Sequence, residues 1–156
     1  MRVLAIDPGY GRCGVAVLEK RDGKERWMYS DCIKTSAQAP FDERLHAVVR
    51  ECERLIEHFE PNALAMERLY FNTNQKTAMR VAEVRGALLH AATARNIPVS
   101  EYTPGQIKSA TTSYGKADKK QITLMVRALL NIEKAITLDD EYDAIAVGIT
   151  HLAHAR

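Results

Sequence analysis

The sequence is poor in the residues that build disulfide-bonded, repetitive or disordered chains. Its three cysteines form no CxxC pair, so we predict reduced, buried thiols rather than a disulfide framework or a zinc site. Eight glycines and five prolines leave no linker or low-complexity tract, and one domain over residues 1–156 is expected. Apolar runs stay far below the roughly 18 residues of a membrane span. A soluble, cytoplasmic protein without membrane contact is therefore expected.

A strong overall charge is also missing, because the formal net charge is only +2. The charges are nevertheless segregated along the chain. Residues 104–127 carry five basic side chains and one acid, a net charge of +4. Residues 131–143 carry five acids and one lysine, a net charge of −4. Two such segments could hold a polyanion over metal ions, or could be two solvated surfaces.

Hydrophobic patterns predict an α/β fold. Strands are expected near residues 2–7, 14–18, 26–34, 63–67 and 99–102. Helices are expected at residues 41–59 and 74–95, from residue 104, from residue 118, and from about residue 139 to the C-terminus. Thr103 with Gln106, and Asp118 with Gln121, have the spacing of helix N-terminal caps. The turn at residues 8–11 makes the first two strands an antiparallel hairpin, so we predict a mixed five-stranded sheet of this hairpin plus parallel strands, with helices on both faces.

Residues 9–14 match the GxGxxG pattern of dinucleotide-binding sites. We exclude that function, because the pattern requires a helix to open within it, whereas Val15–Leu18 is typical of a strand. The glycines are predicted to form the hairpin and to allow close backbone approach. The same hairpin resembles the phosphate loop of the Hsp70, actin and sugar-kinase ATPases, but those enzymes clamp the nucleotide between two such domains.

Four carboxylates fall where predicted strands end and where the last helix begins. Asp7 and Glu67 end strands, while Asp140 and Asp143 lie three residues apart on one helical face. Each alone is an ordinary turn or helix-start residue. Together they are typical of a divalent-metal site, because a carboxylate at the end of a buried strand is costly without a partner. Phosphodiester hydrolysis is therefore the leading hypothesis.

Two other features have weaker functional interpretations. His151 and His154 have a spacing seen in metal sites, but no third ligand accompanies them, so we predict surface or interface residues. The helix at 74–95 carries many small residues that permit close helix–helix approach. It either packs on its own sheet or presents an extra apolar side as a dimer surface.

Taken together, these motifs resemble those of the RuvC-type Holliday junction resolvases, dimeric members of the ribonuclease H-like superfamily. Residues 6–9 are similar to the family's opening motif, residues 65–70 to its second and residues 140–151 to its closing motif, so the likeness covers essentially the whole chain. The resemblance implies a ribonuclease H-like fold. It also implies a structure-specific endodeoxyribonuclease that makes paired symmetric nicks in four-way DNA junctions during homologous recombination and repair.

The resemblance implies roles for individual residues. The catalytic residues would be the four metal ligands Asp7, Glu67, Asp140 and Asp143, together with Lys108 and Lys119. Tyr70 would be an aromatic that meets DNA at the crossover. The other DNA-binding residues that we predict are Phe71, Lys76, Arg80, Lys116 and Lys120. Spacing alone selects Lys119 over its neighbour Lys120.

The cofactors implied are two Mg²⁺ ions per active site, which Mn²⁺ could replace. The partners implied are four-way junction DNA, a second copy of the chain and a branch-migration helicase complex of the RuvA–RuvB type. YqgF-type proteins resemble the chain in the same way, so a nuclease acting on RNA or other nucleic acid is an alternative. A catalytically idle nucleic-acid-binding module or an ATPase domain is another.

Overall fold

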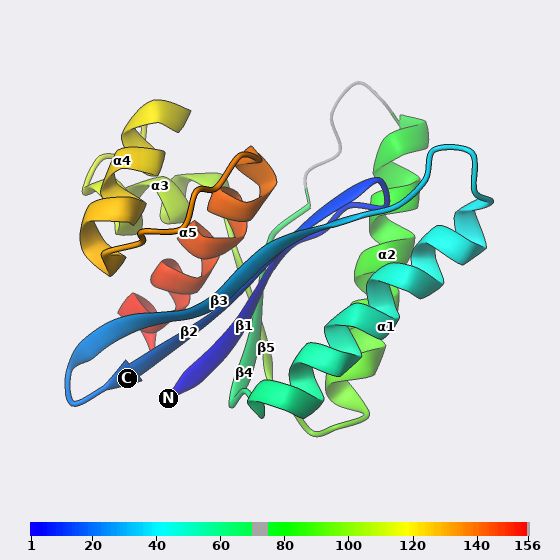
Figure 1. Ribbon diagram of the computed structural model, residues 1–156, viewed down its shortest axis with the longest axis horizontal. Helices are drawn as coiled ribbons and strands as arrows, with labels where there is room; N and C mark the ends of the chain where they lie inside the picture. The colour runs from blue at the N-terminus through cyan, green and yellow to red at the C-terminus, as the bar shows by residue number, and fades with distance from the viewer. Residues whose placement is uncertain (70–74, 156) are drawn as a thin grey trace.

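The computed structural model describes residues 1–69 and 75–155, in which a five-stranded sheet lies between two layers of helices (Figure 1). The strands are β1 (Arg2–Asp7), β2 (Arg12–Arg21), β3 (Lys24–Lys34), β4 (Ala63–Glu67) and β5 (Val99–Tyr102). The helices are α1 (Phe41–Phe59), α2 (Gln75–Thr93), α3 (Pro104–Thr112), α4 (Lys119–Leu130) and α5 (Asp139–His154). All the predicted elements are present, and β2 and β3 are longer than predicted because their ladder continues to the turn at Asp22 and Gly23.

The strand order is β3-β2-β1-β4-β5. β2 is antiparallel to both β1 and β3, whereas β4 is parallel to both β1 and β5. The mixed sheet predicted from the sequence is therefore confirmed. Because β1, β4 and β5 run in the same direction, their C-terminal ends meet at one edge of the sheet.

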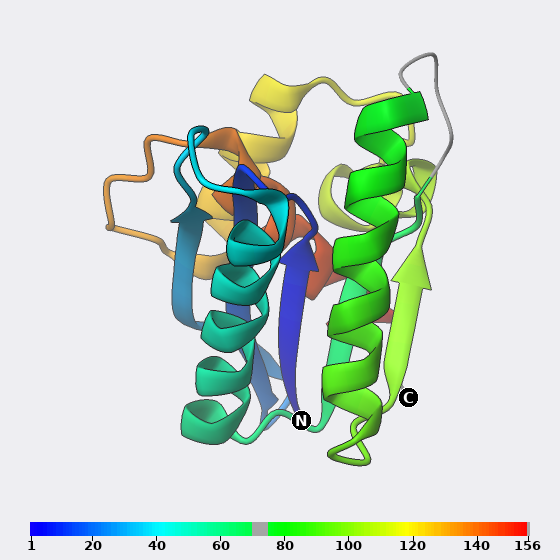
Figure 2. The same ribbon diagram turned by 90° about the vertical axis from the view of Figure 1, so that its right-hand side faces the viewer.

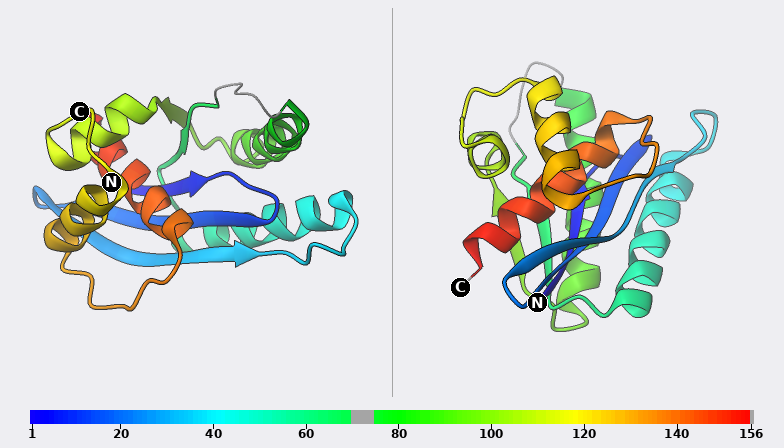
Figure 3. Two further views of the ribbon diagram at one scale, coloured as in Figure 1. Left: turned by 90° about the horizontal axis from the view of Figure 1, so that it is seen from above. Right: turned by 60° about the vertical axis from the view of Figure 1, so that its left-hand side comes forward.

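Each face of the sheet has its own apolar core. Alternate side chains of β1 point to opposite faces, so Leu4 and Ile6 pack with α1 and α2, whereas Val3 and Ala5 pack with α5. Figure 2 shows α1 and α2 side by side across the first face, and Figure 3 shows α5 lying obliquely across the other. β1, the first two-thirds of β2 and β4 are buried on both faces, which explains why they are continuous apolar runs.

Local signals place the helices near the site. Thr103 with Gln106, and Asp118 with Gln121, form complete capping boxes, so α3 and α4 begin where predicted. The three cysteines are buried and free, as predicted. Among the helices within residues 1–69 and 75–155, none combines the length and apolar character needed to cross a bilayer.

The prediction that His151 lies at the surface is wrong. Its side chain is only 5% exposed, and its Nδ1 lies 3.0 Å from the hydroxyl oxygen of Tyr102 in β5. The reason is that α5 is covered by the sheet on one side and by α3 and α4 on another, which leaves little of its surface free. His154 is exposed, in agreement with the prediction.

Candidate active site

Two of the predicted acids end neighbouring parallel strands. Ile6 of β1 pairs with Met66 of β4. The next residues, Asp7 and Glu67, therefore lie side by side at the same edge of the sheet. Both are partly buried. The strand ends bring these two carboxylates together as the sequence predicted.

The other two acids reach this edge from α5. The first turn of α5 comes close to the sheet at Gly14, where a Cβ atom would stand 1.9 Å from the backbone oxygen of Asp140. Gly14 lies opposite Asp7 in the β1–β2 ladder. The close backbone approach predicted from the glycines therefore brings Asp140, and Asp143 nearly one turn later, to the end of β1.

Burial and like charge together make Asp7 a weak acid. Burial is the main reason that its pKa rises from 3.8 to about 8. The charges of Asp143, Glu67 and Asp140 raise this pKa further, and the charge of Lys119 opposes them. All four predicted acids therefore lie within electrostatic reach of one another. At neutral pH, full ionisation of the group requires additional positive charge.

Two lysines face the acids across a cleft. Lys108 of α3 and Lys119 of α4 line this cleft with Glu67 and Asp143. Burial raises the pKa of both acids. The positive charges of Lys108 and Lys119 lower the pKa of Glu67, and that of Lys119 lowers the pKa of Asp143. The cleft thus combines buried carboxylates with cations placed opposite them.

Lys119, rather than Lys120, is the lysine that points to the acids. Its Nζ lies 2.8 Å from Asp139 Oδ2 and 3.4 Å from Asp143 Oδ2. The hydrogen bond to Asp139 is the main reason that the pKa of Lys119 is raised and that of Asp139 is lowered. The choice made from spacing agrees with this geometry.

The donor set suits a hard divalent cation, because carboxylate oxygens are the ligands that Mg²⁺ and Mn²⁺ prefer. Asp140 Oδ2 is buried and accepts no hydrogen bond from the described residues, although Arg12 Nε lies 3.2 Å away as an ion-pair partner. As placed, no three His, Cys, Asp or Glu side chains within residues 1–69 and 75–155 are close enough to hold a metal ion. Instead, Arg12 and Lys119 pair with Asp140 and Asp143.

Sequence reasoning missed Arg85 of α2. Its buried guanidinium donates to the backbone oxygen of Glu67 and forms an ion pair with Glu101. Arg85 therefore joins α2 to the ends of β4 and β5, and its charge lowers the pKa of Glu67. The sequence could have revealed this role, because Arg85 lies between Val84 and Leu88 on the apolar side of the helix. A charged side chain is rarely buried without a partner, so its position predicts one.

Arg12 was missed as well, because it lies inside the glycine-rich hairpin that was interpreted through its glycines alone. Among the predicted DNA contacts, Lys76, Lys116 and Lys120 are exposed. Arg80 lies over the ring of Phe41 at 4.1 Å from its centroid. Arg80 also forms an ion pair with a neighbouring glutamate of α2. Tyr70 and Phe71 lie outside the described residues.

Comparison with known proteins assigns the family. The family model for crossover junction endodeoxyribonuclease RuvC matches residues 3–151. The chain belongs to the RuvC family. It is 41% identical over 156 residues to the RuvC of Syntrophomonas wolfei, covering 100% of this chain and 91% of that one. It is 43% identical over 151 residues to the RuvC of Petrotoga mobilis, covering 97% and 93% of the two chains.

The fold agrees with that of the RuvC family. A structure of Thermus thermophilus RuvC in complex with a Holliday junction substrate superposes with a TM-score of 0.92 at 34% identity, covering 100% of this chain and 95% of that chain. The predicted ribonuclease H-like fold is therefore confirmed. The matched RuvC segment contains all four acids of the site and both lysines that face them.

Proposed function

We propose that this chain is a Holliday junction resolvase, a metal-dependent endodeoxyribonuclease that makes paired symmetric nicks in four-way DNA junctions during recombination and repair. One observation carries the proposal: in a chain of the RuvC family, four acids gather at one edge of the sheet with two lysines facing them. The complex of the Thermus thermophilus relative with a Holliday junction supports this choice of substrate. The residues 1–156 would act as one nuclease domain, in the cytoplasm.

The four acids would hold two Mg²⁺ ions, with Mn²⁺ as a substitute. When bound, the ions supply an activated water and stabilise the leaving oxygen. The ion pairs of Arg12 with Asp140 and of Lys119 with Asp143 must open for these acids to serve as ligands. The Arg12 side chain is 53% exposed, so it can turn into solvent when a cation takes its place beside Asp140.

The remaining charged side chains would act on the DNA phosphates. Lys108 and Lys119 would steady negative charge on the phosphate being cut, because oriented cations stabilise charge that develops during phosphoryl transfer. Arg85 would hold Glu67 in place through its backbone oxygen. The wider DNA surface would comprise Tyr70, Phe71, Lys76, Arg80, Lys116 and Lys120.

Symmetric nicking requires two active sites related by a twofold axis, so we propose a homodimer. We place the dimer contact on the exposed side of α2. There Met79 is 62% exposed, and a Cβ atom at Gly86 would have nothing within 4 Å. Gly86→Arg therefore fits the single chain and should yield monomers. Sedimentation would show the change from dimer to monomer. Lys24→Ala, in the distant β2–β3 hairpin, is a suitable control, whereas Gly23→Arg is not, because Gly23 has a positive φ. An unchanged dimer in Gly86→Arg would refute α2 as the interface.

A partnership with a branch-migration helicase complex of the RuvA–RuvB type rests on the family resemblance alone. The function itself is tested by cleavage of a synthetic four-way junction in magnesium, beside duplex DNA and RNA of the same sequence. Paired nicks in the junction and none in the duplex are expected. Faster cleavage of RNA than of the junction would favour a YqgF-type activity. Tight binding of the junction without cleavage would favour a catalytically idle binding module.

A further inference from the structure

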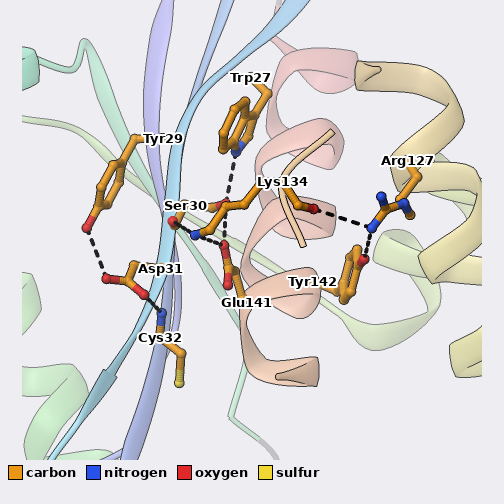
Figure 4. A network of polar contacts seen from close by, with 9 residues as sticks. All are labelled: Trp27, Tyr29, Ser30, Asp31, Cys32, Arg127, Lys134, Glu141 and Tyr142. Carbon is orange, nitrogen blue, oxygen red and sulfur yellow. Dashed lines mark hydrogen bonds and ion pairs between the residues drawn. The ribbon is translucent and has the colours of Figure 1, made fainter. Parts of the chain in front are cut away.

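Glu141 is a buried charge in the first turn of α5, between Asp140 and Asp143. Its side chain is only 6% exposed. Its Oε1 accepts hydrogen bonds from Ser30 Oγ at 2.6 Å and from Lys134 Nζ at 2.7 Å. Figure 4 shows these groups meeting between β3 and α5. A buried carboxylate is costly unless it is paired and hydrogen-bonded, so these two donors determine where Glu141 can lie.

The donors are themselves held. Lys134 Nζ also donates to the backbone oxygen of Ser30 at 2.6 Å, and Trp27 Nε1 donates to Ser30 Oγ at 2.9 Å. The contacts join three segments that are distant in the sequence: β3, the loop between α4 and α5, and the first turn of α5 (Figure 4). We call Ser30, Lys134 and Glu141 the clamp.

The clamp is placed to control the acids of the site. Residues of one helical turn move as a unit, so a fixed Glu141 fixes the directions in which Asp140 and Asp143 project. The backbone of Asp140 is in close contact with Gly14, so the same turn also packs directly on β2. Lys134 supplies positive charge from the buried side of this acidic turn, and Lys119 supplies it from the exposed side.

We propose that the clamp positions the metal ligands of α5, holding Asp140 and Asp143 where they meet Asp7 and Glu67 once a divalent cation binds. This inference rests on the proposed function in taking these four acids as the ligands. Ser30 and Lys134 bind Glu141 rather than Asp140 or Asp143, so the clamp acts through the helix and its members are positioning residues. Outer residues that orient metal ligands typically change metal affinity 10–100-fold when they are removed.

If the clamp served stability alone, its loss would lower the melting temperature without changing the metal affinity. A matched control for Lys134 lies at the far end of α5. There Lys20 Nζ of β2 donates to the backbone oxygen of Leu152 at 3.2 Å, so it too is a lysine that ties α5 to the sheet. Lys134→Met and Lys20→Met remove the same group from opposite ends of one helix. Both variants are expected to unfold at a lower temperature.

The experiment titrates the full chain with Mn²⁺ and with Mg²⁺ in the absence of DNA, following the metal-induced rise in melting temperature. Lys134→Met should need about 10-fold more metal than the wild type, whereas Lys20→Met should stay within about twofold. Lys134→Arg, which keeps the charge, should recover most of the affinity. Excess metal should restore the cleavage rate of Lys134→Met. Ser30→Ala, a smaller change, should shift the titration in the same direction if Lys134→Met does not fold.

Equal metal affinity in Lys134→Met and the wild type would overturn the proposal, and so would an equal loss in both lysine variants. A wild-type chain that binds no divalent cation would overturn it together with the metal site. A wild-type chain that binds metal but cuts no junction would contradict the proposed function alone, because the metal titrations would still decide the role of the clamp.

Discussion

Charged side chains hold the first turn of α5 in place. Neutral hydrogen-bonding groups and one lysine hold its last turn to the sheet. The first turn carries Asp139, Asp140 and Glu141, which pair with Lys119, Arg12 and Lys134. At the last turn, His151 Nδ1 lies 3.0 Å from the Tyr102 hydroxyl oxygen, and Lys20 Nζ of β2 donates to the backbone oxygen of Leu152 at 3.2 Å.

We infer from this comparison that the first turn serves function and the last turn serves stability. Neutral hydrogen bonds fix a helix at little desolvation cost, whereas buried acids oppose folding and persist where a cation uses them. The two ends also respond to pH in opposite directions. Burial and like charge raise the pKa of Asp7 near the first turn, while burial and the charge of His154 lower the pKa of His151 near the last.

The largest effect should follow from neutralising one acid near the first turn. Asp7→Asn should reduce the cleavage rate at least about 1000-fold, because metal-ion catalysis contributes several kcal/mol and each 1.36 kcal/mol is tenfold. Junction binding should remain, since little surface is lost. Single-turnover rates and binding measured on one preparation check this. Asp140→Asn and Asp143→Asn should behave alike, and we expect manganese to restore part of the rate in one of them. Cleavage by Asp7→Asn near the parent rate would contradict the metal site.

A smaller loss is expected from the cleft lysines. Lys108→Ala should slow cleavage about 100-fold with little change in binding, because an oriented cation acts on charge that develops during reaction. The exposed Lys116 is the matched control: Lys116→Ala should weaken binding and lower its salt dependence by about one charge, with the single-turnover rate kept. A salt titration beside the rate separates the two roles. An unchanged rate in Lys108→Ala would remove it from the active site.

Asp7 should also oppose folding when metal is removed. Its pKa is 3.8 when unfolded and about 8 when folded, so between these values the folded chain holds the additional proton. Stability in chelator should therefore fall as pH rises, by at most about 1.4 kcal/mol per pH unit. At pH about 8, Asp7→Asn should be more stable than the wild type by at least about 1 kcal/mol. Urea denaturation tests this, with the exposed Glu133→Gln as a control whose effect should stay within about 0.5 kcal/mol.

The smallest effect should come from the last turn, with the opposite sign. Because the pKa of His151 is lowered from 6.5 in the folded chain, the unfolded chain binds the additional proton, and stability should fall as pH decreases below about 6.5. His151→Gln should remove this decrease while keeping a polar group near Tyr102. The comparison is best made in an Asp7→Asn background, where the raised pKa of Asp7 no longer contributes to the pH dependence. The exposed His154→Gln should alter the slope much less, and an equal change in both variants would contradict a buried, neutral His151.

The fold was largely predictable because its signals are local. Apolar periodicity predicted the strands and helices, and the capping residues Thr103 and Asp118 predicted where α3 and α4 begin. The acids were predictable for the same reason, since parallel strands end together and an i, i+3 pair shares a helical face. His151 was mispredicted because burial depends on which other elements cover α5, and helical spacing carries no such information.

The sequence by itself determined the elements, the four acids, the glycines that permit a close backbone approach and the family resemblance, because each depends on neighbouring residues. Only the tertiary structure decided which charges meet. Ser30 and Glu141 are separated by 111 positions yet share a hydrogen bond of 2.6 Å, and Arg85 of α2 reaches the backbone of Glu67 at the end of β4. The raised pKa of Asp7 likewise comes from burial and from acids on other elements. Desolvation and Coulomb interactions depend on distance in space rather than along the chain, so these properties exist only once the helices have packed on the sheet.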